Sequence, residues 1–193
     1  MGDIAVFGGS FDPPHLGHLE IIRVALEKLA IEKLFVVPCF LNPFKTGSLF
    51  TPIKRLNWLN SLLMGKDSRL EVLDFEIKQN KPTPTLITIE FIEKLYKPHK
   101  IYLLLGADNI ETLPKWYQYE SLKHKVEFVI IPRKGYEIVG NFKVLSMQEI
   151  EISSTQIKLA LQKGDLGVLE FIPSAISEEI LKRKEIARQR KSY

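Results

Sequence analysis

The sequence predicts a doubly wound α/β fold, with a mostly parallel sheet of five to six strands and helices on both faces. Short apolar runs alternate along the chain with longer segments in which apolar residues recur every three or four positions. Strands that alternate with helices form right-handed βαβ units, which give a parallel sheet. The 193 residues fit one domain, and a composition of 45% hydrophobic and 26% charged residues can bury a core.

The expected strands are short apolar runs bounded by polar or turn-forming residues. They are Ile4–Phe7, Leu34–Val37, Leu70–Leu73, Ile101–Leu105 and Val126–Ile131, with Val144–Leu145 as a weaker sixth. In open α/β sheets, ligands bind beyond the carboxyl ends of the strands. We therefore expect one crevice, lined by the segments that follow four of the strands. These are the segments after Phe7, Val37, Leu105 and Ile131.

Helical spacing of apolar residues predicts the helices. The first spans Leu19–Leu29, the second Ile53–Leu63, the third Leu86–Leu95, and two more lie near 157–161 and 176–186. Thr51 and Pro52 form a typical helix start, with Thr as the cap and Pro at the first helical position. Pro98 is expected to end the third helix. We predict a single domain, 1–193, in which a Rossmann-like core (1–150) precedes C-terminal helices and a basic tail (151–193).

Charge and cysteine content restrict the partners. Six Lys and Arg residues against one Glu after residue 181 account for the net charge of +4, so the rest of the chain is close to neutral. Hence we expect neither a nucleic acid nor a membrane as partner, and a solvated tail. The single cysteine, Cys39, and the lack of a signal or spanning segment favour a cytoplasmic protein. Homo-oligomer formation stays open.

The segment Gly8–His18 carries the residues best suited to chemistry. Gly8 and Gly9 let the backbone approach a ligand closely. The helix that follows offers free N–H groups and the positive end of its dipole to an anion. His15 and His18 are three residues apart, so both can face one bound group. These features favour phosphate chemistry, which needs positioning and charge stabilisation.

Other interpretations of this segment stay open. Two histidines at this spacing also fit a helix cap or a metal site, but no third ligand stands at a spacing that completes such a site, so no metal site is predicted. The two common glycine-rich phosphate loops are absent. A hydrolase nucleophile elbow is excluded because Asp12 occupies the position of its last glycine.

The run Gly9-Ser10-Phe11-Asp12-Pro13-Pro14-His15-Leu16-Gly17-His18 resembles the G-[TS]-F-D-x-x-H-x-G-H signature of the nucleotidyltransferase superfamily. Further segments, over about residues 3–175, resemble the bacterial nicotinate-mononucleotide adenylyltransferases. They are Leu105-Gly106-Ala107-Asp108-Asn109, Leu113-Pro114-Lys115-Trp116-Tyr117, Ile131-Pro132-Arg133-Lys134-Gly135 and Ile152-Ser153-Ser154-Thr155-Gln156-Ile157-Lys158.

The resemblance implies transfer of the adenylyl group of ATP to nicotinate mononucleotide, giving nicotinate adenine dinucleotide and pyrophosphate, with Mg²⁺ held by the phosphates. It assigns catalysis to His15, His18 and Lys45. ATP would bind at Gly8, Gly9, Ser10, Phe11, His15, His18, Lys45, Gly106, Asp108, Ile152, Ser153, Ser154 and Thr155. The mononucleotide would bind at Ser10, Phe11, Thr85, Asp108, Trp116 and Arg133. We expect both histidines to be cationic beside the triphosphate, because its charges outweigh the helix dipole.

Two segments depart from the family pattern. Asn42-Pro43-Phe44-Lys45 stands where the family commonly has Pro-Pro-His-[KR], so a histidine is missing beside Lys45. Thr83-Pro84-Thr85 stands where the family has Ser-Tyr-Thr, which removes a tyrosine ring and one backbone N–H. Alternative functions are adenylyl transfer to nicotinamide mononucleotide or phosphopantetheine, or a non-catalytic nucleotide sensor.

Overall fold

The computed structural model describes residues 2–42, 47–148 and 150–189. Within them lies one six-stranded sheet in the order β3-β2-β1-β4-β5-β6, and every neighbouring pair of strands is parallel. The strands are β1 (Ile4–Gly9), β2 (Lys33–Pro38), β3 (Leu70–Val72), β4 (Ile101–Gly106), β5 (Glu127–Ile131) and β6 (Lys143–Val144). The predicted doubly wound α/β class is confirmed, including the weaker sixth strand.

The longer helices also follow the prediction. They are α1 (Leu16–Lys28), α2 (Pro52–Leu63), α4 (Thr85–Tyr96), α6 (Ser154–Lys163) and α7 (Ser174–Gln189). Thr51 caps α2 by accepting from the Lys54 N–H, with Pro52 at the first helical position. The chain leaves α4 through Lys97 in a left-handed conformation just before Pro98. Sequence periodicity missed the short helices α3 (Phe75–Lys78) and α5 (Tyr119–Lys125), since neither is long enough to repeat its apolar spacing.

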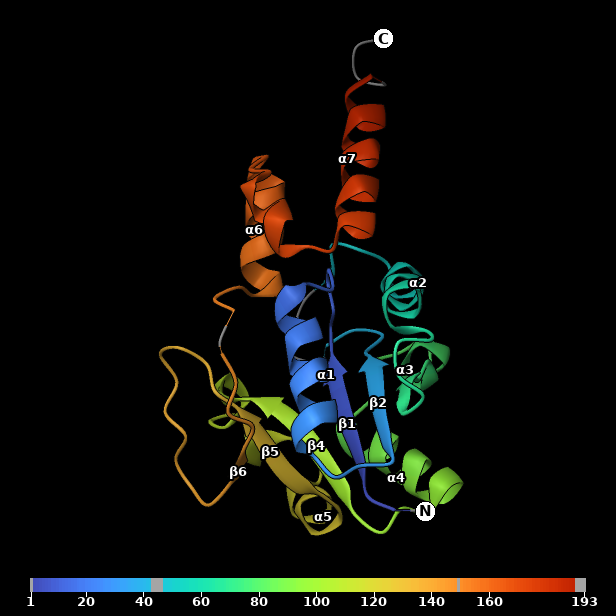
Figure 1. Ribbon diagram of the computed structural model, residues 1–193, viewed down its shortest axis with the longest axis vertical. Helices are drawn as coiled ribbons and strands as arrows, with labels where there is room; N and C mark the ends of the chain where they lie inside the picture. Colours follow the sequence, from blue (N-terminus) through green and yellow to red (C-terminus); the bar gives the residue numbers. More distant parts are fainter. Residues whose placement is uncertain (1, 43–46, 149, 190–193) are drawn as a thin grey trace.

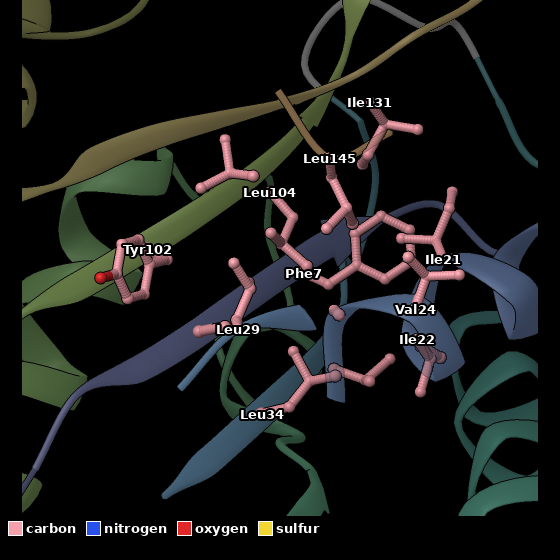
Figure 2. Packing of buried hydrophobic residues seen from close by; sticks show 14 of the residues in the cluster. Phe7, Ile21, Ile22, Val24, Leu29, Leu34, Tyr102, Leu104, Ile131 and Leu145 are labelled. Carbon is pink, nitrogen blue, oxygen red and sulfur yellow. The ribbon is translucent and has the colours of Figure 1, made fainter. Parts of the chain in front are cut away.

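Alternate side chains of the strands build two apolar layers. On one face, Phe7 and Leu104 pack against Ile21 and Ile22 of α1, as Figure 2 shows. On the other face, Val6 and neighbouring strand residues pack against α4 and α5. This period-two division is what a sheet covered on both sides requires. Packing on both faces holds the strands in place, and with them the loops that follow the strands.

Helices α6 and α7 both lie beyond the carboxyl ends of the strands (Figure 1). Ile157 of α6 and Ile176 of α7 share a small buried cluster with Trp58 of α2. The start of α6 is therefore held beside the loops that leave the sheet. The division of the chain near residue 150 stays a prediction. No helix in the described part of the chain combines the length and hydropathy needed to cross a bilayer.

Candidate functional site

A continuous cleft lies where the strand order reverses, between β1 and β4. Its centre, here the His15 pocket, has a volume of about 380 Å³. The Trp116 pocket, about 370 Å³, adjoins it through Gly8, Gly9 and Gly106. A third hollow of about 360 Å³, the Arg133 pocket, shares His15 and Arg133 with the centre. The cleft occupies the position expected of a ligand site in a doubly wound sheet.

The structure brings almost all of the predicted site residues into this cleft. The His15 pocket is lined by Gly8, Gly9, Ser10, Phe11, His15, His18, Gly106, Asp108, Arg133, Ser153, Ser154 and Thr155. Thr85 and Trp116 line the Trp116 pocket, and Ile152 lines the Arg133 pocket. Lys45, and the Phe44 that departs from the family pattern, lie outside the described residues. The segments after β1, β2, β4 and β5 all contribute, as the sheet rule predicts.

Two glycines shape the centre of the cleft. A Cβ atom added at Gly8 would meet nothing within 4 Å, yet Gly8 lines both main pockets, so a side chain there would project into the space for ligand. A Cβ at Gly106 would overlap the Asp108 carboxylate and lie 3.2 Å from Arg133 Nε. Glycine at 106 therefore makes room for the Asp108–Arg133 ion pair, whose atoms are 3.4 Å apart.

His15 and His18 lie stacked at the start of α1, with ring centroids 3.7 Å apart. His18 Nδ1 accepts a hydrogen bond of 3.2 Å from the His15 backbone N–H, so the His18 proton sits on Nε2 in this geometry. The His18 ring also packs against Phe11, whose own side chain is fully buried. The Phe11 ring thus supports the histidine from below the surface.

The His15 ring is buried and has no hydrogen-bond partner for either nitrogen among the described residues. Burial and repulsion from the Arg133 guanidinium lower the pKa of His15 to about 3. His15 is therefore neutral at pH 7 in the ligand-free protein. Unpaired ring nitrogens that line a pocket are the groups that a bound anion would satisfy.

The N-terminus of α6 is anchored to the segment that carries the histidines. Ser153 caps the helix by accepting from the Gln156 N–H at 3.2 Å. The Ser154 hydroxyl donates to the Pro13 carbonyl at 3.3 Å. Two helix starts, those of α1 and α6, therefore border the His15 pocket. Their free N–H groups and dipoles favour an anionic ligand.

The Trp116 pocket has a different character. Leu103, Leu104 and Leu105 of β4 contribute apolar walls, and Trp116 flanks the opening with a buried indole N–H that lacks a partner among the described residues. Thr85 stands at the start of α4, after Pro84 at the cap position. A flat ring with one polar substituent fits such walls.

Sequence reasoning missed two residues that hold the site together. Asp12 is buried and accepts hydrogen bonds of 2.9 Å from the Leu49 and Phe50 N–H groups. Its carboxylate also lies 3.4 Å from Lys158 Nζ on α6. Asp12 therefore joins the first segment to the loop after β2 and to the last helices. Its place inside the superfamily signature was the available signal.

Arg55 of α2 is the second missed element. It is fully buried and donates hydrogen bonds to the carbonyls of Phe50, Ser10, Cys39 and Phe40. The guanidinium thus ties the segment after β1, at Ser10, to the segment after β2. Nothing in the sequence distinguishes Arg55 from a surface arginine on an amphipathic helix.

Among the described residues, no group of three or more His, Cys, Asp or Glu side chains lies close enough to hold a metal ion.

Comparison with known proteins agrees with this geometry. The cytidylyltransferase-like family model matches residues 6–160. Relatives named "Probable nicotinate-nucleotide adenylyltransferase" include one from Nitratiruptor sp., 40% identical over 93% of this chain and 97% of its own length. Another, from Aliarcobacter butzleri, is 42% identical over 92% of this chain and 94% of its own.

Solved structures share the fold. The nicotinic acid mononucleotide adenylyltransferase of Plasmodium falciparum, in complex with NaAD, superposes with a TM-score of 0.77 at 22% identity. The match covers 95% of this chain and 96% of that one. The sequence matches and the geometry of the cleft lead to the same enzyme family. The chain therefore belongs to the cytidylyltransferase-like family and, within it, to the nicotinate-nucleotide adenylyltransferases, which are nucleotidyltransferase enzymes.

Proposed function

We propose that this enzyme transfers the adenylyl group of ATP to nicotinate mononucleotide, forming nicotinate adenine dinucleotide and pyrophosphate for NAD biosynthesis in the cytoplasm. The observation that carries the proposal is the junction of two unlike pockets at Gly8, Gly9 and Gly106. One is bordered by two helix starts and two histidines, and the other is apolar and flanked by Trp116. The relatives are named for this activity, and the Plasmodium enzyme binds the dinucleotide product.

In the proposed reaction, a phosphate oxygen of the mononucleotide attacks the α-phosphorus of ATP. The new P–O bond forms as the bond from the α-phosphorus to the oxygen bridging to the β-phosphorus breaks, and pyrophosphate leaves with that electron pair. No protein side chain acts as nucleophile. Catalysis then rests on alignment and on stabilisation of the charge that builds up on the transferring phosphate.

The residues of the His15 pocket take the phosphate roles in this proposal. His15 and His18 face the transferring and leaving phosphates, and the backbone of Gly9–Phe11 with the Ser10 hydroxyl holds them. The start of α6, Ser153–Thr155, receives the triphosphate, and Lys45 is assigned to ATP by the family resemblance. The proposal therefore places all the phosphates at the two helix starts, where free N–H groups attract them.

The mononucleotide and the adenosine occupy the flanks. Trp116 stacks on the pyridine ring, and Thr85 faces its carboxylate. Asp108 accepts from ribose hydroxyls, a role its two oxygens suit. Arg133 reaches ligand phosphate and is held near Asp108 by their ion pair, whose atoms are 3.4 Å apart. Ile152 packs beside adenosine from the Arg133 pocket.

A magnesium ion fits this arrangement as part of the ATP complex. Asp108 is the only carboxylate that lines the His15 pocket among the described residues, and it is engaged with Arg133. Such a pocket suits an ion held mainly by phosphate oxygens and water. When bound, the ion neutralises charge on the phosphates.

Pyrophosphate release from ATP, measured with each acceptor in turn, tests the proposal. Rapid release with nicotinate mononucleotide is the expected result. Preferred release with nicotinamide mononucleotide or phosphopantetheine would replace the proposed acceptor. ATP binding without release, whichever acceptor is offered, would favour a nucleotide sensor and contradict catalysis. Sedimentation of the same preparation gives the oligomeric state.

A further inference from the structure

A buried carboxyl group lies in the wall of the Trp116 pocket, and the reaction described above does not use it. Glu76 of α3 is only 7% exposed, and it lines the pocket together with Thr85 and Trp116. Its Oε1 accepts a hydrogen bond of 2.7 Å from the hydroxyl of Thr88, a buried residue of α4. That is the only hydrogen bond given for this carboxyl among the described residues, and Oε2 is not one of the fully enclosed atoms without a partner, so it keeps some exposure to the pocket. A carboxyl oxygen that faces a ligand pocket is free to form a hydrogen bond with a bound ligand.

The protonation state of Glu76 decides which ligand groups can form a hydrogen bond with it. Burial raises the pKa of Glu76 to about 7, and the Thr88 hydrogen bond opposes the rise. The protonated carboxyl can donate to an anionic oxygen. The ionised carboxylate can only accept, and it repels another carboxylate.

Other titratable groups around the pocket are few. On α3 itself, Lys78 is paired with Asp74 at 3.0 Å. Lys115, Cys39 and Tyr117 are the other titratable residues that line the pocket among those described, and the facing residue of α4 is the uncharged Thr88. Lys115 brings a positive charge to the pocket, which favours an anionic ring substituent. Glu76 is the group positioned to change between donating and accepting a hydrogen bond.

We propose that Glu76 selects between the two pyridine mononucleotides, donating a hydrogen bond to the ring carboxylate of nicotinate mononucleotide when protonated and accepting one from the ring carboxamide of nicotinamide mononucleotide when ionised. This inference rests on the proposed function, because it assumes that the pyridine ring enters the Trp116 pocket. It makes the acceptor preference of the enzyme dependent on pH.

The test is the ratio of kcat/KM for nicotinate mononucleotide to kcat/KM for nicotinamide mononucleotide, measured from pH 6 to pH 8. The acceptor phosphate and the two histidines act equally on both substrates, so their titrations cancel in the ratio. The wild-type ratio is expected to fall by at most about tenfold per pH unit, and so by up to about a hundredfold over this range, since one proton is lost from one group. Glu76→Gln, which can donate and accept at any pH, is expected to give a flat ratio.

Two further variants sharpen the test. Thr88→Val removes the hydrogen bond that stabilises the ionised carboxylate, so the midpoint of the fall is expected to move to higher pH. Glu90→Gln changes an exposed carboxylate of the same helix and is the matched control, with a profile like that of wild type. A flat wild-type ratio, or a Glu76→Gln profile that falls as wild type does, overturns the inference.

Thermal unfolding gives a readout that needs no ligand. A folded-state pKa above the unfolded one means that wild type loses stability as pH rises from about 4.5 to about 7. The melting temperature of Glu76→Gln relative to wild type should therefore rise over that range, and a difference that stays constant would count against the inference. If neither mononucleotide releases pyrophosphate at any pH, the proposed function fails instead, so the two failures are distinguishable.

Discussion

ATP binding is predicted to bring a proton into the protein, and His15 is the group that takes it up. In the ligand-free protein His15 is neutral, because burial and the Arg133 guanidinium lower its pKa to about 3. Its ring lines the pocket assigned to the triphosphate, and both ring nitrogens lack partners among the described residues. Introducing several phosphate charges there reverses the electrostatic balance.

The free energies that decide whether His15 takes up a proton can be worked out from the structure. Protonating a group with a pKa of about 3 at pH 7 costs about 5 kcal/mol. One negative charge about 4 Å from the ring returns about 4 kcal/mol at an effective dielectric constant of 20, so two phosphate charges in range exceed the cost. A second proton on His18 would meet repulsion of about 4 kcal/mol across the 3.7 Å between the rings. The stacked geometry therefore favours one added proton over the two cationic histidines expected from the sequence.

Calorimetric titration with ATP at pH 7.5, in buffers of different ionisation enthalpy, measures this uptake. The slope of observed enthalpy against buffer enthalpy should correspond to about 0.5 to 1 proton per ATP. His15→Gln should reduce the slope to near zero while ATP still binds. A wild-type slope of zero, or an equal slope in the variant, would refute the reasoning.

Three further predictions concern single side chains. His18→Ala is expected to lower turnover by about 10² or more with an unchanged circular dichroism spectrum, because it removes stabilisation of the charge on the transferring phosphate. Turnover close to that of wild type would contradict this role of His18. Gly8→Val adds a side chain where nothing lies within 4 Å of the Cβ position, so KM for both substrates should rise at least about tenfold with little change in melting temperature; a large loss of melting temperature with KM unchanged would contradict this. Arg55→Met leaves four carbonyls without their charged donor, and urea unfolding should show a loss of about 3 kcal/mol or more. The control Arg23→Met changes an arginine whose side chain is 61% exposed, so its loss should be much smaller, and equal losses in the two variants would argue against the buried network.

Much of the fold could be predicted because local signals agree with the global structure. The apolar runs at Ile4–Phe7 and Ile101–Leu105 are buried strands that continue to Gly9 and Gly106. The parallel register, with Gly8 opposite Val37, extends β1 beyond its apolar run. Thr51 and Pro52 begin a helix as their chemistry requires.

The cleft was predictable for a topological reason. Once the strands are ordered and parallel, the loops after β1, β4 and β5 must meet at one edge of the sheet. The motif residues on those loops follow, which is why Asp108 and Arg133 lie together although they are separated by a helix and a strand. The roles assigned to individual site residues stay predictions.

Two of the missed residues share a physical cause. Arg55 and Glu76 are charged side chains buried by tertiary packing, and no local pattern distinguishes them from solvated residues on helices. Their partners, which include the carbonyl of Ser10 for Arg55 and the hydroxyl of Thr88 for Glu76, are set by how loops and helices meet. Such contacts are properties of the fold that appear only when the chain is assembled.

The most direct test of the central claim follows one oxygen label through the reaction. Nicotinate mononucleotide carrying ¹⁸O on its phosphate is incubated with ATP and the enzyme, and the products are analysed by mass spectrometry. Attack by the mononucleotide phosphate on the α-phosphorus predicts a dinucleotide that retains all of the label and pyrophosphate that carries none. Labelled pyrophosphate, or AMP and pyrophosphate without dinucleotide, would contradict the account.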